Sequence, residues 1–203
     1  MYAELHCLSN FSFQRGASHP RDLVQRAAEL GYTALAITDE CSLAGVVKAH
    51  VAAQEYDIKL IIGSELNLEE GIKLLALVPN RAAYSELSGL ISMARRRSPK
   101  GEYQVSLRDV IFHLKRCMLI WLPEENNPVS RAYGLQLQRL CKGRVWLGVS
   151  HLLSNDEIER YLSLYHLASE LSLPMVACGN VQMHHPKRKP LHDVLTALYH
   201  NTS

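Results

Sequence analysis

The chain has 203 residues, of which 47% are hydrophobic and 21% charged, and its formal net charge is +2. This composition is typical of a folded protein with a substantial core, which excludes a disordered chain, and the small charge gives no support to strong nucleic-acid binding by the surface as a whole. The five cysteines form no CxxC pair, which favours reduced thiols in a cytoplasmic protein over a zinc ribbon or a disulfide framework. No apolar run approaches the ~20 residues of a membrane span, so we expect no membrane partner.

Short apolar runs alternate with amphipathic segments along the chain. Strands are expected at 2–6, 34–38, 59–65, 73–78, 117–122, 145–149 and 174–178, and helices at 20–30, 43–55, 81–94, 106–114, 128–141, 155–171 and 190–199. Alternation of this kind predicts an α/β fold with a parallel sheet covered by helices. Seven units suit a seven-fold β/α barrel, somewhat smaller than the eight-fold barrel. An open doubly wound sheet is the alternative, but no glycine-rich phosphate loop follows the first strand.

The stretch 35–45 (LAITDECSLAG) organises the chain. An apolar strand runs into two adjacent carboxylates, Asp39 and Glu40, and Ser42 is the expected N-cap of the following helix. In α/β folds, functional groups collect at the carboxyl ends of strands, so this pair marks a candidate site.

Polar side chains follow several other strands. These strand-end residues are His6, Asp39 with Glu40, Glu65, Ser150 with His151, and Asn180 with Gln182. Imidazole and carboxylate groups at one rim could hold Zn, Mn or Fe and activate water against a phosphate ester. The simpler interpretation is that strands of any barrel end in polar residues, and the residues alone leave both open.

Three segments carry a family resemblance. Residues 2–13 (YAELHCLSNFSF), 36–40 (AITDE) and 61–65 (IIGSE) resemble successive motifs of the polymerase and histidinol phosphatase (PHP) domain. More narrowly, they are similar to the N-terminal PHP domain of bacterial C-family DNA polymerases. The longer strings 10–20, 39–45 and 190–197 are most similar to the error-prone, alpha-type members of that group.

The resemblance covers nearly the whole chain and implies a distorted seven-fold β/α barrel. It implies a single PHP domain over residues 1–203, as the N-terminal part of a larger, cytoplasmic polymerase. That polymerase would synthesise DNA across lesions during repair, with Mg bound by a palm domain outside this chain. The expected partners are the remainder of the polymerase, DNA through the parent enzyme, and other damage-response polymerase components. The chain alone lacks the palm, so we expect it to have an architectural role and no polymerase activity.

The resemblance also identifies metal-ligand positions, of which this chain keeps only some. Retained are His6, Asp39 and Glu65, while Leu8, Lys73, Asn180 and Gln182 stand where active members carry ligands. Glu40 replaces a histidine, and His151 or Leu152 occupies a further ligand position. Leucine has no lone pair, lysine is cationic, and neutral amides are poor ligands for Zn or Mn. We therefore expect a degenerate site that requires no cofactor and holds at most one weakly bound Zn or Mn at His6, Asp39 and Glu65, with Glu40 and His151 as further candidates.

Two basic segments are candidate contacts to a DNA backbone. They comprise Arg95, Arg96 and Arg97 in one segment, and Lys187, Arg188 and Lys189 in the other. Such contacts are independent of base sequence and sensitive to salt, although charge runs are more often simply solvated. Two other hypotheses remain open at this level: a metal-dependent phosphoesterase or 3′–5′ exonuclease, and a stand-alone protein-interaction module.

Overall fold

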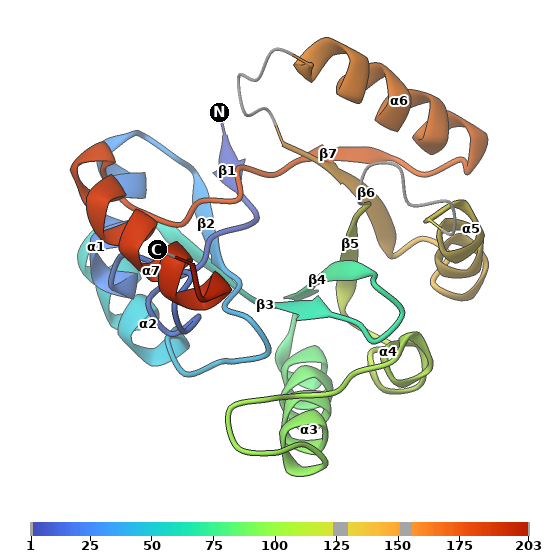
Figure 1. Cartoon of the computed structure of the whole chain (residues 1–203), viewed down its shortest axis with the longest axis horizontal. Coiled ribbons are helices and arrows are strands. Elements are labelled where there is room, and N and C mark those ends of the chain that lie inside the picture. The colour runs from blue at the N-terminus through green and yellow to red at the C-terminus, as the bar shows by residue number, and fades with distance from the viewer. Residues whose placement is uncertain (1, 124–129, 151–155, 203) are drawn as a thin grey trace. The chain divides into compact units, whose positions relative to one another are not determined.

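A computed structural model describes residues 2–123, 130–150 and 156–202. The chain divides into two compact units, one formed by residues 1–64 and 179–203 and the other by residues 65–178. Seven strands follow one another in the sheet in chain order, from β1 to β7, with helices between most of them (Figure 1). The predicted alternation of strands and helices is therefore confirmed.

The first unit contains the beginning and the end of the chain. Its elements are β1 (Ala3–Glu4), α1 (Pro20–Glu29), β2 (Ala34–Ile37), α2 (Val46–Glu55), most of β3 (Lys59–Asn67), a short 3-10 helix η1 (Pro186–Arg188) and α7 (Lys189–His200). β1 and β2 pair in parallel, as do β2 and β3. After β7 the chain returns to β1, where Val181 donates to the His6 carbonyl at 2.9 Å and accepts from the Leu8 amide at 2.8 Å.

Small side chains bring α1 and α2 together on the outside of β2. Ala27 of α1 and Ala49, Ala52 and Ala53 of α2 are buried in one apolar cluster with Leu35 and its neighbours. Alanine adds little bulk at these positions, so the two helices can pack closely over the strand. This cluster is the core that supports the carboxyl end of β2.

The second unit contains the middle of the chain. Its elements are β4 (Lys73–Val78), α3 (Arg81–Arg96), α4 (Leu107–His113), β5 (Met118–Leu122), α5 (Ser130–Leu140), β6 (Val145–Val149), α6 (Glu157–Glu170) and β7 (Met175–Ala177). β5, β6 and β7 pair in parallel. Trp121 of β5 is fully buried, and a side chain at Gly134 of α5 would lie 2.7 Å from its ring, so this glycine permits close helix–strand packing.

The prediction of an entirely parallel sheet is wrong at β4. This strand runs antiparallel to β5, with Leu75 opposite Ile120. Only the turn 68–72 precedes β4, and the Leu68 amide donates to the Ile72 carbonyl across it at 2.8 Å. A parallel connection needs a crossover of a dozen or more residues, so this turn reverses the chain.

The predicted start of α2 is also wrong. The helix begins at Val46 with Gly45 as its N-cap, and Ser42 instead accepts from the Ala44 amide at 3.2 Å. Residues 41–45 therefore form a turn between β2 and α2, and this turn lies against Asp39. No helix in the described part of the chain is long and apolar enough to cross a membrane.

Candidate functional site

Asp39 lies directly after β2, as the sequence predicts, and its side chain is 1% exposed. Its carboxylate accepts three hydrogen bonds of 2.7 Å, from the Ser9 amide, the Ser9 hydroxyl and the Ser12 hydroxyl. Burial raises the pKa of Asp39, while the serine donors act in the opposite direction. A carboxylate has about four acceptor sites, so most of its capacity is used within the protein.

The loop 7–18 supplies these donors by folding back on Asp39. Ser12 Oγ donates to Asp39 and accepts from the Glu40 amide at 3.0 Å. Backbone hydrogen bonds close the loop, from the Ser12 amide to the Ser9 carbonyl at 2.9 Å and from the Arg15 amide to the Ser12 carbonyl at 3.0 Å. The loop 7–18 is thus held in a defined structure around one buried carboxylate.

Glu40 forms an ion pair with Arg15 from the same loop. The Arg15 guanidinium lies 2.7 Å from Glu40 Oε2, and the two side chains are 16% and 18% exposed. Where the resemblance implies a histidine ligand in active members, this chain has a carboxylate that binds an arginine.

Further contacts hold the other side of the Asp39 turn. The Ser64 hydroxyl donates to the Asp39 carbonyl at 2.7 Å and accepts from the Ser42 amide at 3.2 Å. A side chain at Gly45 would lie 2.8 Å from Asp39 Oδ2. The turn that precedes α2 is therefore packed directly on the carboxylate.

His6 is buried, at 2% exposure, beside a second buried carboxylate, Glu4, that the sequence pattern did not indicate as a site residue. Glu4 is equally buried and accepts from the Tyr2 hydroxyl at 2.9 Å, the His6 amide at 2.8 Å and the Gly179 amide at 2.7 Å. A charged residue in a strand that is otherwise expected to be buried was the available signal. Glu4 attaches the returning segment at Gly179 to β1.

The family positions without metal ligands also have structural contacts. Leu8 is fully buried, and Lys73 lies at the start of β4 opposite Leu122. The Gln182 side chain donates to Asn180 Oδ1 at 3.4 Å and forms a hydrogen bond with the His192 ring of α7. Gln182 thus connects Asn180 and the segment after β7 to the last helix.

Glu65 belongs to the second unit, where it is fully buried and accepts from the Asn67 side chain at 3.3 Å. His151, the remaining candidate ligand, and Leu152 lie outside the described residues. Cys7 and Cys41, which adjoin candidate ligands, are buried cysteines outside any disulfide, as their small apolar character suggests.

In the first unit, the carboxylates at two of the expected ligand positions have partners within the protein. Asp39 is occupied by serine donors, and Glu40 by Arg15. Within each unit, the described residues include no group of three His, Cys, Asp or Glu side chains that could hold a metal ion. The donor set is suited to fixing the loop 7–18.

The first basic segment ends α3 and binds the loop that follows it. Arg95 donates to the Gly101 carbonyl at 3.1 Å and lies over the Tyr103 ring, and Arg97 pairs with Asp109. Arg96 is exposed. Two of the three arginines thus have a structural role, and contact of this segment with DNA stays a prediction.

Replacement of Asp109 by alanine should destabilise the second unit by about 1–2 kcal/mol, because it removes the capping box of α4 together with the Arg97 pair. Burial acts to raise the pKa of Asp109, but the Arg97 guanidinium and the Ser106 donors outweigh it and lower the pKa to about 2. The contribution is therefore present above the unfolded pKa and is lost as pH falls toward about 2. Denaturant unfolding of both proteins over acidic pH checks this, and an equal acid sensitivity of the variant would contradict it.

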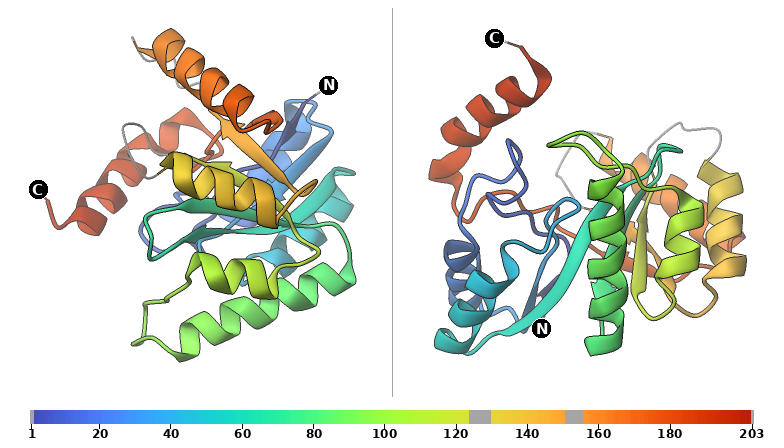
Figure 2. Two further views of the ribbon diagram at one scale, coloured as in Figure 1. Left: turned by 90° about the vertical axis from the view of Figure 1, so that its right-hand side faces the viewer. Right: turned by 90° about the horizontal axis from the view of Figure 1, so that it is seen from below.

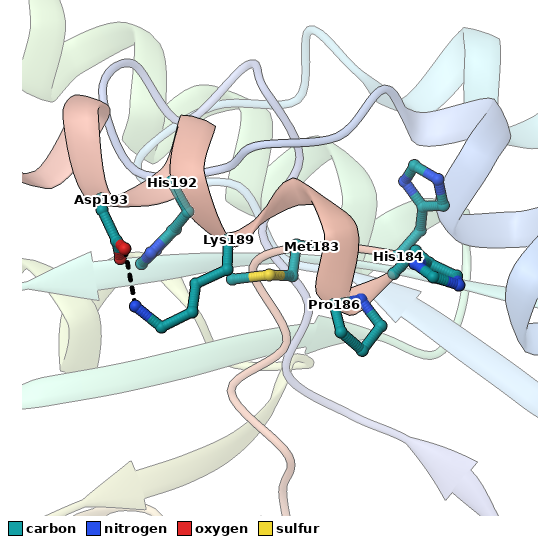
Figure 3. A pocket seen from close by; sticks show the side chains of 7 residues that line it. Met183, His184, Pro186, Lys189, His192 and Asp193 are labelled. Atoms are coloured by element: carbon teal, nitrogen blue, oxygen red, sulfur yellow. Dashed lines mark hydrogen bonds and ion pairs between the residues drawn. The ribbon is translucent and has the colours of Figure 1, made fainter.

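The second basic segment adjoins a pocket of about 560 Å³ (Figure 3). The pocket is lined by Met183, His184, His185, Pro186, Lys189, His192 and Asp193. His184 bonds Ser18, Lys189 pairs with Asp193 at 2.6 Å, and Arg188 donates to the Ala17 carbonyl. Lys187 is exposed. The three histidines of the pocket thus bind three different partners: His184 binds Ser18, His185 accepts from the Lys187 amide, and His192 binds Gln182. Contact of this basic segment with DNA stays a prediction.

Comparison with known proteins extends over the whole chain. The family model of the PHP domain matches residues 4–120. The error-prone DNA polymerase of Saccharophagus degradans is 52% identical over 201 residues, which are 99% of this chain and 20% of that protein. That of Methylococcus capsulatus is 50% identical over 199 residues, or 98% of this chain and 19% of that protein. The chain spans about one fifth of the length of the curated relatives it matches.

Two solved structures share the fold at low sequence identity. A protein of Bifidobacterium adolescentis, provisionally assigned as a metal-dependent phosphoesterase, matches with a TM-score of 0.63 and 18% identity, over 91% of this chain and 88% of its own. An amidohydrolase of Chromobacterium violaceum matches with a TM-score of 0.69 and 16% identity, over 90% and 88%. The predicted fold class, a seven-strand β/α barrel of this type, is confirmed.

Proposed function

The chain belongs to the PHP domain family, and we propose that it is the PHP domain of an error-prone, damage-tolerant DNA polymerase, in which its role is architectural. The 52% identity to an error-prone DNA polymerase, over 99% of this chain, supports a parent protein of that kind. In this proposal residues 1–203 act as one domain of a cytoplasmic enzyme. The remainder of the polymerase is its direct partner, and DNA and other damage-response components are reached through it.

The hydrogen bonding of Asp39 is the observation that carries the architectural role. A ligand for a catalytic metal must offer oxygen lone pairs to the ion, yet the Asp39 oxygens accept from Ser9 and Ser12. Leu8, Lys73 and Gln182 also stand at positions where active family members carry metal ligands. These residues and the hydrogen bonds of Asp39 support a site that no longer hydrolyses a substrate and instead holds the loop 7–18 in place. The expected weak site for a single Zn or Mn at His6, Asp39 and Glu65 stays a prediction that metal analysis of the purified chain tests, and Mg is assigned to the parent polymerase.

We expect the purified chain to hydrolyse neither a phosphate monoester nor single-stranded DNA when supplied with Mn or Zn, because the acceptor capacity of Asp39 is directed to serines. Turnover measured with nitrophenyl phosphate and with a labelled oligonucleotide, alongside metal analysis of the protein, checks this. Stoichiometric metal with turnover that Asp39→Asn abolishes would instead establish the phosphoesterase or exonuclease hypothesis.

The polymerase assignment is tested in a chimera in which this chain replaces the matched fifth of the Saccharophagus degradans relative. We expect the chimera to extend a primed template with Mg, including one that carries an abasic site. The same polymerase without its first fifth should lose most of this synthesis, since the domain supports the rest of the enzyme. Equal synthesis by the shortened polymerase would contradict an architectural role.

A further inference from the structure

Helix α7 presents an apolar stripe to solvent. Leu191, Val194 and Leu198 are 42%, 57% and 55% exposed, and their spacing of three and four residues places them on one face of the helix. No residue of α7 is buried within the described structure. In Figure 2 the helix, drawn in red, extends away from α1 and α2 of its own unit.

The opposite side of α7 is polar, and the His192 ring on it bonds the Gln182 side chain of the preceding segment. The Thr196 hydroxyl on the same side donates to the His192 carbonyl at 2.9 Å within the helix. Both residues are half-buried. An ordinary surface helix turns its apolar face to the core and its polar face to water, so the polarity of α7 is reversed.

A reversed helix of this kind requires a partner. Isolated helices shorter than about 12–15 residues are marginal in water, and α7 has 12 residues with little apolar burial of its own. A contiguous exposed apolar surface on a helix is typical of a contact site. The question is therefore which surface covers Leu191, Val194 and Leu198.

We propose that this stripe docks onto the body of the polymerase, the polypeptide that makes up the other four fifths of the relatives. The inference rests on the proposed function and names the surface through which it acts. Three side chains cover roughly a few hundred Å², well short of the ~800 Å² per partner of a stable free association. Such a contact suffices when both surfaces belong to one chain, because the tether supplies a high effective concentration. The small size of the stripe thus favours the covalently continuous partner over a second copy.

Hydrogen exchange of the α7 amides tests the proposal. The isolated chain is compared with the chimera that carries it in the Saccharophagus degradans polymerase. Opening of α7 should be frequent in the isolated chain, and in the chimera its amides should gain at least about 100-fold protection through docking. The variant Val194→Glu/Leu198→Glu should lose most of this gain in the chimera while leaving the exchange of α7 in the isolated chain unchanged.

A matched pair on α2 provides the control. Val47 and Val51 have the same i, i+4 spacing and are 72% and 56% exposed. Val47→Glu/Val51→Glu should leave the protection of α7 in the chimera intact. DNA synthesis by the same chimeras tests the proposed function separately. The docking of α7 and the proposed function can therefore fail independently of each other.

Three outcomes would overturn the inference. The first is equal exchange of α7 in the isolated chain and in the chimera. The second is full protection in the Val194→Glu/Leu198→Glu chimera. The third is protection of the isolated chain that rises with its concentration, which would assign the stripe to a second copy.

Discussion

Asp39→Ala should lower the free energy of unfolding by about 3–5 kcal/mol, whereas Asp39→Asn should lower it by no more than about 1.5 kcal/mol. Alanine leaves the Ser9 amide and the hydroxyls of Ser9 and Ser12 without their acceptor in a buried site. Each buried donor without a partner costs about 1–3 kcal/mol, and the Ser9 amide cannot rotate toward another acceptor. Urea unfolding of the three proteins at neutral pH measures the difference.

Asparagine keeps most of this arrangement. Its carbonyl can take the place of Asp39 Oδ1, which accepts from the Ser9 amide and the Ser12 hydroxyl. Its amide then faces the Ser9 hydroxyl, which already accepts from the Phe11 amide at 3.2 Å and would lose its own acceptor. The lost hydrogen bond is offset because no charge is buried. A loss with asparagine as large as that with alanine would mean that charge, rather than hydrogen bonding, makes Asp39 important.

The raised pKa of Asp39 predicts a pH dependence that the asparagine variant lacks. Because burial raises the pKa in the folded chain, the folded chain keeps the Asp39 proton to higher pH than the unfolded chain does. The contribution of Asp39 to stability is therefore fully present below its unfolded pKa and declines as pH rises through its folded pKa. The difference in unfolding free energy between the wild type and Asp39→Asn, followed from about pH 3 to about pH 7, isolates this effect. A difference that grows in favour of the wild type with rising pH would contradict it.

Local pattern was sufficient to predict that Asp39 follows a buried strand. The apolar run before Asp39 placed this carboxylate at a strand end, and the alternation of runs placed the seven strands in order. The reversal at β4 could have been predicted as well, because the turn 68–72 is too short for a crossover helix. In these cases the determining interactions are close in sequence. They can therefore be recognised from the spacing of apolar residues or from the length of a connecting segment.

The partners of the site residues could not be predicted in the same way. Ser9 and Ser12 reach Asp39 across 30 and 27 positions, and nothing in a polar loop specifies which carboxylate it will surround. Arg97 similarly appears as part of a basic run until the loop that follows supplies Asp109. α2 begins at Val46 and not directly after Ser42, as predicted, because the intervening turn packs on Asp39. This tertiary contact overrides the local preference of serine for the N-cap.

Gly16→Ala should be the most damaging single-methyl substitution in the loop 7–18, with a loss of about 3 kcal/mol or more. An added Cβ at this position would lie 1.9 Å from the Ser9 carbonyl oxygen and 2.9 Å from the Asn10 amide nitrogen. Both contacts are with backbone atoms, so no side chain can rotate to relieve them. The loop itself must move, and with it the Ser9 amide and hydroxyl that bind Asp39.

Gly89→Ala is the matched control, since Gly89 lies within α3 and an added Cβ there meets nothing within 4 Å. Alanine is favoured over glycine inside a helix, so this variant should gain about 0.5–1 kcal/mol. The double variant Gly16→Ala/Asp39→Ala should lose less than the sum of its two single losses, because each change releases the same loop from the same carboxylate. Denaturant unfolding of the four variants and the wild type measures these differences. Additive losses, or a Gly16→Ala protein as stable as the wild type, would show that the loop and Asp39 do not form one cooperative structure.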